Sequence, residues 1–344
     1  DIGHLFHRAG ENGNAGGIGT VCVDGLKGAA FAATPIPEGD RFDLDFVAHE
    51  MGHQFGANHT WSFDTEGTGV QAEPASGTTI MGYAGIAQGN NVADQGDDYF
   101  HYYSIVQMSD YVSTLSCGTS VALTNQPPSL SPLQDYVIPI GTAFALDGTA
   151  TDPDVADQLT YAWEQVDNGV VTTSSFGPEN PVGANFRSLP PTTEPIRYFP
   201  RLERILSGEL TQTDPATGSA WETVSEIERD LTFAVTVRDN SPEGGQVASG
   251  LATVSVRSSA GPFRLTSQET DVSYAAGSLQ TINWDVAGTR DGPINCQFVD
   301  LWFSADGGAT FPELLASGLP NTGDALVQMP AAPTSQGRLM LKAS

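Results

Sequence analysis

Hydrophobic residues in the first third of the chain recur at helical spacing in two stretches, residues 44–55 and 100–116. Residues three or four positions apart share one face of a helix, so each stretch predicts an amphipathic helix. Asp43 and Asp45 are suited to cap the first helix or to lie in its first turn. Residues 8–34 are rich in glycine and predict strand and loop. The apolar positions of the two helices are Leu44, Val47, Met51, Phe55, Ile105, Met108, Val112 and Leu115.

Residues 124–128 have the composition of a linker. Beyond them, several runs of residues alternate between apolar and polar positions. A period of two is typical of strands that bury one face, and turn residues bound each run as in a β-sandwich. The stretch 170–225 is irregular and predicts a long insertion. A second β-module begins near Gly261, and Asp306-Gly307-Gly308 predicts a hairpin within it. The alternating runs are Leu159/Tyr161/Trp163, Leu231/Phe233/Val235/Val237, Ala252/Val254/Val256, Ile282/Trp284/Val286 and Val299/Leu301/Phe303.

The 344 residues are too many for one compact core and predict a multidomain chain. Residues 1–122 predict an α/β (α+β) domain. Residues 123–258 and 259–344 predict all-β modules that resemble immunoglobulin-like sandwiches of cadherin or polycystic-kidney-disease type. The chain begins at Asp1 rather than Met, and a strand pattern runs up to Ser344. We therefore expect a fragment of a longer precursor, with the second β-module truncated.

The first predicted helix carries the pattern H-E-x-x-H-x-x-G-x-x-H without a mismatch. His49 and His53 are four residues apart and share one helix face, so both can bind one metal ion. Glu50 projects beside the metal. Gly56 permits a positive φ, after which the chain can turn back and offer His59 as a third ligand. Three protein ligands on zinc leave a fourth position for water, which is the arrangement of a catalytic site.

These residues resemble the metzincin clan of zinc metalloproteases, and within it the secreted bacterial group of the reprolysin (adamalysin) family. Animal reprolysins usually carry Asp where this chain has Thr60, and Tyr83 is not typical of them. In such domains well over a hundred residues precede the zinc helix, whereas 48 precede His49. Residues 1–122 are thus expected to be the C-terminal part of a metzincin catalytic domain. The matching segments are Asp1–Phe6, Gly16–Cys22, His49–His59, Thr79–Tyr83 and Asp98–His101.

The resemblance assigns roles to two residues that follow the zinc helix. Metzincins place a methionine-containing turn beneath the zinc, and Met81 is suited to form its apolar floor. In the astacin and serralysin branches, a tyrosine at the offset of Tyr83 approaches the zinc and stabilises the oxyanion. Tyr83 can do the same here, or it can simply pack the turn, and the sequence leaves both open.

The resemblance also implies a disulfide between Cys22 and Cys117. Such a bond closes a loop of about 94 residues, which stabilises the fold by about 4 kcal/mol in the chain-entropy model. Two buried free thiols are the alternative, and they are less usual in a secreted protein. Cys296 is left over, either free or paired beyond Ser344.

The composition fits a secreted enzyme. Its formal charge is −27, from 41 acids and 14 bases. Residues 1–122 hold 15 acids and 3 bases (net −12), which leaves 26 acids and 11 bases (net −15) for the remainder. An acidic surface disfavours nucleic acid and anionic membranes as partners. No apolar run of about 20 residues is present to span a membrane.

The sequence therefore predicts a secreted zinc-dependent metalloendopeptidase that acts on protein or peptide substrates, with Glu50 as general base. Gly17–Val21 is the candidate edge strand for binding extended substrate. One alternative is another metzincin branch. A second is a non-catalytic extracellular adhesion or binding protein with a degenerate protease domain, whose β-modules bind a polymer or surface. The intact Glu50 argues against the second alternative.

A group of aspartates in the first β-module has a spacing that can surround Ca²⁺, which prefers oxygen ligands. A solvated acidic turn is the favoured alternative, because no complete calcium loop is present. The histidines outside the zinc motif, His4, His7 and His101, are expected to be structural. The acidic group comprises Asp147, Asp152, Asp154 and Asp157.

Overall fold

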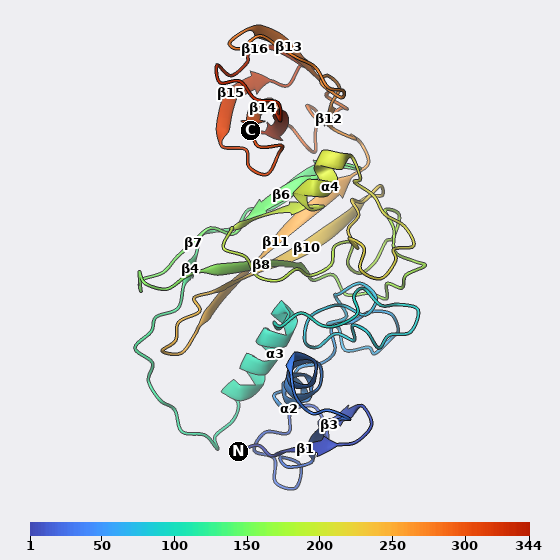
Figure 1. The fold of residues 1–344 in the computed structure, drawn as a ribbon, viewed down its shortest axis with the longest axis vertical. Coiled ribbons are helices and arrows are strands. Elements are labelled where there is room, and N and C mark those ends of the chain that lie inside the picture. The colour runs from blue at the N-terminus through green and yellow to red at the C-terminus, as the bar shows by residue number, and fades with distance from the viewer.

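The computed structural model describes all 344 residues, and three regions follow one another along its longest axis (Figure 1). The N-terminal region (residues 1–113) holds a small sheet and the longest helix. The first β-module (residues 129–257) lies between this region and the second β-module (residues 264–343). The chain is therefore mostly β, with few helices. None of its helices combines the length and apolar character that a membrane span requires.

The N-terminal sheet has three strands in the order β1-β3-β2. Strand β1 pairs parallel with the central strand β3, so that His4 lies opposite Ala30, and β2 pairs antiparallel with β3 on the other side. Strand β3 is almost wholly buried, because it carries alanines that pack beneath the zinc-motif helix. The strands are β1 (His4–Arg8), β2 (Asn12–Asn14) and β3 (Ala30–Thr34).

The prediction of an edge strand at Gly17–Val21 is wrong, because this segment is a loop. Its N–H groups are used elsewhere: Gly19 donates to the carbonyl of His53 (2.8 Å) and Thr20 to that of Gln54 (2.9 Å). The last carbonyls of a helix have no partner within it, so a loop that donates to them closes the helix end. The edge of the sheet on this side is β2 instead.

The zinc-motif helix forms as predicted but is not α-helical throughout. It opens with α1 (Asp40–Phe42), continues as a π-helical segment η1 (Asp43–Ala48) and ends with α2 (His49–Gln54). Neither Asp43 nor Asp45 caps the helix, since it starts earlier, at Asp40, with Gly39 as an N-cap that has no side chain. Both aspartates lie instead in the first turn of the π-helical segment. Gly56 leaves the helix with φ of 102°, as the motif requires.

The second predicted helix is α3 (Tyr102–Ser113), which ends five residues before Gly118. His101 caps it, because the His101 Nδ1 accepts the N–H of Tyr103 at 3.2 Å. The Tyr111 hydroxyl near its end donates to the carbonyl of Gly19 (2.7 Å) and joins α3 to the loop that closes α2. The disulfide between Cys22 and Cys117 is formed, with Cα atoms 6.2 Å apart, and it reinforces this connection. Cys296 is free.

The first β-module has a four-stranded sheet, β5-β11-β10-β8, that packs against two short strand pairs, β6-β9 and β4-β7. The predicted alternation of burial holds in β11, where Ala252, Val254 and Val256 are buried and the residues between them are half-buried. In β10 it fails, because Phe233 to Val237 are all buried. The stretch 170–225 is mostly irregular but contains one strand and one short helix. The elements are β4 (Ser129–Leu130), β5 (Tyr136–Pro139), β6 (Phe144–Asp147), β7 (Ala150–Thr151), β8 (Thr160–Gln165), β9 (Ile196–Phe199), α4 (Leu202–Ser207), β10 (Arg229–Arg238) and β11 (Val247–Arg257).

The second β-module consists of two three-stranded sheets, β12-β13-β16 and β15-β14-β17. Strands β14 and β15 pair antiparallel around the predicted hairpin at Asp306-Gly307-Gly308. A small core of Ile282, Leu301, Val327 and Met329 lies within this module. The elements are β12 (Arg264–Leu265), β13 (Leu279–Asp285), β14 (Phe298–Ser304), β15 (Glu313–Pro320), β16 (Asp324–Gln328) and β17 (Arg338–Ala343).

Candidate metal centre

Helix α2 and the turn after it bring three imidazoles together. His49 and His53 lie one helical turn apart with ring centroids 4.8 Å from each other, and the exit at Gly56 lets His59 return to 4.5 Å from His53. One nitrogen from each ring lies within 4.8 Å of the other two. The structure thus places all three histidines of the sequence motif in one group.

The second nitrogen of each ring is bound to an acceptor. His49 Nδ1 lies 2.7 Å from the carbonyl of Ile80, His53 Nδ1 lies 2.8 Å from the carbonyl of Ala57, and His59 Nδ1 lies 2.6 Å from a carboxylate oxygen of Glu66. Carbonyl and carboxylate oxygens only accept, so each Nδ1 carries the proton. Each Nε2 is left as a lone-pair donor, and hydrogen bonds of this kind fix the orientation of histidine ligands to metals.

These three nitrogens fit a divalent cation. The Nε2 atoms of His53 and His59 are 3.0 Å apart, and with both Nδ1 atoms protonated, two lone pairs face each other. Burial, with His53 and His59 nearby, lowers the pKa of His49 well below its ordinary value. Burial and His53 lower the pKa of His59 to about 3. The imidazoles are therefore neutral at neutral pH, which is the form that binds zinc, and a cation between them removes the lone-pair repulsion.

Glu50 lies next to His49 on α2 and is 8% exposed. Burial raises the pKa of its carboxyl to about 7, although the backbone N–H of Ala15 partly offsets this effect. Strand β2 runs directly beside it, because a side chain added at Gly13 would collide with the Glu50 carboxylate. A carboxyl with this pKa can both take and return a proton near neutral pH.

Met81 lies beneath the histidine helix and is fully buried, in a cluster with Ala57 and Ile80. A Cβ atom added at Gly52 would lie 2.5 Å from the Met81 sulfur. Because glycine has no Cβ, helix α2 can pack closely against the methionine side chain. The carbonyl of Met81 accepts the N–H of Thr60 at 3.1 Å. The turn at Met81 is thus joined to the segment that carries His59.

Tyr83 is half-buried and adjoins the histidines, with its ring 4.6 Å from that of His59 and 5.6 Å from that of His49. Burial, followed by the charges of Glu50 and Glu66, raises the pKa of Tyr83 to about 12. The phenol therefore keeps its proton and remains a hydrogen-bond donor at the edge of the site.

Two features of the site were not found by sequence reasoning. Glu66 lies in an irregular segment, where no periodicity relates it to His59. Trp61 stacks on Phe63 at 4.3 Å and lies 5.6 Å from Tyr83, so an aromatic wall stands beside His59. The alternating pattern Trp61, Phe63 directly after the third histidine is the only sequence signal that could have pointed to this wall.

The other candidate residues lie apart from this group. Carboxylate oxygens of Asp152, Asp154 and Asp157 come within 4.8 Å of one another, whereas Asp147 bonds the hydroxyl of Thr149 instead. Calcium binding by the first three stays a prediction. The remaining histidines do not join the zinc-motif group: His101 caps α3, and His4 contacts Gln54 at 3.0 Å.

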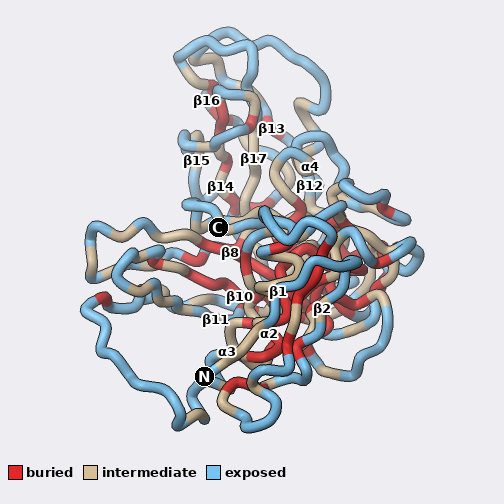
Figure 2. Tube along the Cα trace, turned by 60° about the horizontal axis from the view of Figure 1, so that its bottom comes forward, coloured by how far each residue is buried: buried red, intermediate tan, exposed pale blue.

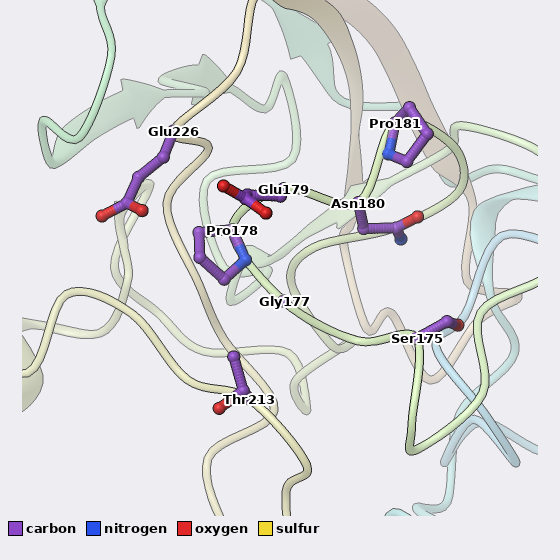
Figure 3. A pocket seen from close by; sticks show the side chains of 8 residues that line it. All are labelled: Ser175, Gly177, Pro178, Glu179, Asn180, Pro181, Thr213 and Glu226. Carbon is purple, nitrogen blue, oxygen red and sulfur yellow. The ribbon is translucent and has the colours of Figure 1, made fainter.

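A polar pocket of about 430 Å³ opens in the irregular stretch of the first β-module (Figure 3). It contains none of the residues of the metal centre and no hydrophobic residue. Its walls are formed by Ser175, Gly177, Pro178, Glu179, Asn180, Pro181, Thr213 and Glu226.

Comparison with known families bears on the N-terminal region. Residues 1–112 match the family described as metallo-peptidase family M12B, reprolysin-like. This reprolysin-like segment spans both strands and helices of the N-terminal region and contains the three histidines, Glu50, Met81 and Tyr83. No curated protein matches the chain.

Solved structures with some similarity to the chain are multidomain proteins of low identity. A chimeric titin Z1Z2 is 10% identical, with 64% of this chain and 92% of that chain covered and a TM-score of 0.20. Extracellular domains 3–5 of Drosophila OTK are 11% identical, with coverages of 64% and 67% and a TM-score of 0.20. Chicken CNTN1 domains FN1–FN3 are 13% identical, with coverages of 66% and 67% and a TM-score of 0.20. Identities and TM-scores this low do not establish a shared fold or function.

Proposed function

We propose that the chain carries the metal centre of a secreted zinc metalloendopeptidase. The observation that carries this proposal is the convergence of one ring nitrogen from each of the three histidines, whose Nδ1 atoms are hydrogen-bonded, beside the buried carboxyl of Glu50. The reprolysin-like match over residues 1–112 supports the same reaction class. The disulfide supports an extracellular setting, since such bonds persist in oxidising compartments.

His49, His53 and His59 would hold the zinc. When bound, the zinc would supply Lewis acidity and lower the pKa of a water molecule toward about 7. Glu50 would act as the general base toward the attacking water and later return the proton to the leaving amine. Tyr83, protonated and beside the histidines, donates a hydrogen bond to the oxyanion that develops on the substrate carbonyl.

Strand β2, one of the two edge strands of the N-terminal sheet, is the place we propose for extended substrate. It runs beside Glu50, so a peptide paired to it would pass the metal centre. Unpaired N–H and C=O groups of an edge strand bind peptide through its backbone. This location replaces the Gly17–Val21 segment, whose N–H groups are already used by α2.

The test is cleavage of a denatured protein substrate by the full chain with zinc, wild type against Glu50→Ala. We expect Glu50→Ala to keep the metal, because Glu50 is not a ligand, and to lose at least about 100-fold in kcat. Glu38→Ala, which changes an exposed acid, is the matched control and should cleave like wild type. If Glu50→Ala retained near-wild-type activity, the mechanism would be wrong.

One outcome would favour the non-catalytic alternative. If the wild-type chain bound zinc and cleaved nothing, the β-modules would become the seat of function and an extracellular adhesion or binding role would replace the protease. The intact Glu50 in a buried, correctly placed position favours the protease.

A further inference from the structure

The segment between His59 and α3 has little regular secondary structure and is held largely by the first β-module. The N–H of Val171 donates to the carbonyl of Ser62 (2.9 Å), and the N–H of Ala75 donates to the carbonyl of Val171 (2.8 Å). Gly169 donates in the same way to the carbonyl of Gln71 (3.1 Å). Residues 169–171 of the first β-module therefore form backbone hydrogen bonds with the loop that follows His59, as a neighbouring strand would.

An apolar cluster is shared between the two regions. Ala75 and Val92 of the N-terminal region pack with Val171, Phe176 and Trp221 of the first β-module, and none of the five is more than 2% exposed. Trp221 meets Phe176 edge to face at 5.2 Å. Figure 2 shows buried residues around α2 in the N-terminal region and along β8 and β10 in the first β-module. Neither region alone would bury this surface.

Arg187 of the β-module reaches across the same boundary. Its guanidinium donates to the Thr78 hydroxyl (3.3 Å) and to a carboxylate oxygen of Asp97 (3.2 Å), and its side chain is 14% exposed. Thr78 and Asp97 are also joined directly, since the N–H of Asp97 donates to the carbonyl of Thr78 (2.6 Å). Arg187 thus fastens both ends of the loop that contains Met81 and Tyr83.

Glu73 links the segment bound by Arg187 to the residues next to the metal centre through hydrogen bonds. It is fully buried, and one carboxylate oxygen accepts the hydroxyls of Thr60 (2.6 Å) and Thr79 (2.5 Å). Its other oxygen accepts the N–H of Thr78 at 3.0 Å. Thr60 directly follows His59, and Thr79 directly precedes Ile80, whose carbonyl orients His49. Hydrogen bonds and residues adjacent in the chain therefore connect Arg187, through Thr78 and Glu73, to the first and third histidines.

We propose that Arg187 is a positioning residue of the metal centre and that the first β-module is a working part of the catalytic unit. The module holds the loop between His59 and α3 in the geometry that presents His59 and the Ile80 carbonyl. The proposal rests on the proposed zinc site. It adds that metal affinity and turnover depend on a region outside the reprolysin-like segment.

The test compares Arg187→Met with Arg229→Met in the full chain. Arg229 is a matched control, since its side chain is also buried in the first β-module but bonds only residues of that module, among them Asn180 and Asn185. Zinc affinity is measured by competition with a chromophoric chelator, and module stability by thermal unfolding. We expect Arg187→Met to weaken zinc binding about 10-fold, as for residues that orient metal ligands. Arg229→Met should lower the unfolding temperature and leave zinc affinity unchanged.

A double-variant cycle separates a positioning role from general destabilisation. If Arg187 acts through Thr78, then Arg187→Met with Thr78→Val should bind zinc no more weakly than the worse single variant, whereas independent effects would multiply. Activity should fall through kcat with little change in KM, because Arg187 touches no substrate. Hydrogen exchange at residues 78–83 should accelerate in Arg187→Met only.

Equal zinc affinity in wild type and Arg187→Met would overturn the proposal. So would an equal loss in Arg229→Met, since the effect would then report only module stability. Neither outcome depends on peptide cleavage. A chain that proved inactive as a protease would fail the Glu50 experiment yet could still pass this one, so the two failures are distinguishable.

Discussion

Each histidine of the metal centre is oriented by a separate acceptor, and only His59 depends on a side chain. Glu66 accepts its Nδ1 proton at 2.6 Å, whereas His49 and His53 are held by the carbonyls of Ile80 and Ala57. A carboxylate in this position fixes the tautomer and raises the basicity of the ligand nitrogen. The third ligand is therefore more sensitive to substitution around it than the first two.

Removal of this carboxylate should loosen the metal. We expect Glu66→Ala to lower zinc affinity about 10- to 100-fold, as measured for second partners of metal-bound histidines, while the fold is kept. Chelator competition measures the change. Asp64→Ala is the matched control, because Asp64 is an exposed acid two residues away whose side chain accepts a hydrogen bond only from the N–H of its neighbour Thr65. Equal losses in the two variants would contradict the role given to Glu66.

Individual site residues could be predicted from the sequence where a motif fixes their spacing, and not elsewhere. The grouping of the three histidines beside Glu50 could be predicted, because helix geometry and the positive φ of Gly56 dictate their positions. Their roles stay a prediction. Glu66 and Glu73 could not be predicted, since each reaches its partner across irregular chain. Glu73 bonds Thr60 and Thr79 at separations of 13 and 6 residues that no periodicity marks.

Among the elements, the loop that closes α2 is held at two points by α3. The Tyr111 hydroxyl bonds the carbonyls of Gly19 and Val21, and the Cys22–Cys117 disulfide ties the same loop to the chain beyond α3. An edge strand was expected at Gly17–Val21, and this expectation was wrong. A strand-like sequence does not show which of its N–H groups will donate hydrogen bonds to the end of a neighbouring helix. The helix itself was predicted, but its π-helical middle segment, Asp43–Ala48, was not.

Loss of the disulfide should destabilise the N-terminal region. Its cysteines are 95 positions apart, so Cys22→Ser with Cys117→Ser should lower the free energy of unfolding by about 4 kcal/mol through a more disordered unfolded state. Urea unfolding followed by fluorescence measures the shift of the midpoint. Cys296→Ser, which removes the free thiol, should leave the midpoint in place. An unchanged midpoint in the double variant would show that the bond contributes nothing.

For the molecule as a whole, period-two patterns predicted the two β-modules well, because burial of one sheet face leaves a local trace in the sequence. The packing of the first β-module against the segment around the metal centre is not marked by any such local pattern in the sequence. Arg187 and Asp97 are 90 residues apart, and the cluster of Ala75, Val92 and Trp221 joins three separate stretches. The N-terminal region and the first β-module therefore share buried contacts across the boundary expected near residue 122, which stays a prediction.

The acidic surface should select among substrates. With a formal charge of −27, the chain attracts cationic peptides over long range. We expect a lysine-flanked peptide to show kcat/KM about 10-fold above a glutamate-flanked peptide with the same central sequence at low salt. The ratio should shrink in 0.5 M NaCl, where charges are screened within about 4 Å. A neutral peptide serves as control. A ratio independent of salt would point to local recognition instead.

The different acceptors of the three imidazoles also bear on how such a centre can change over generations. Every amino acid carries a main-chain carbonyl, so substitution at Ile80 or Ala57 leaves the acceptors of His49 and His53 chemically intact. The acceptor of His59 is encoded by a single codon, that of Glu66. Natural variants that adapt this protein to zinc-poor or zinc-rich surroundings should therefore concentrate at position 66.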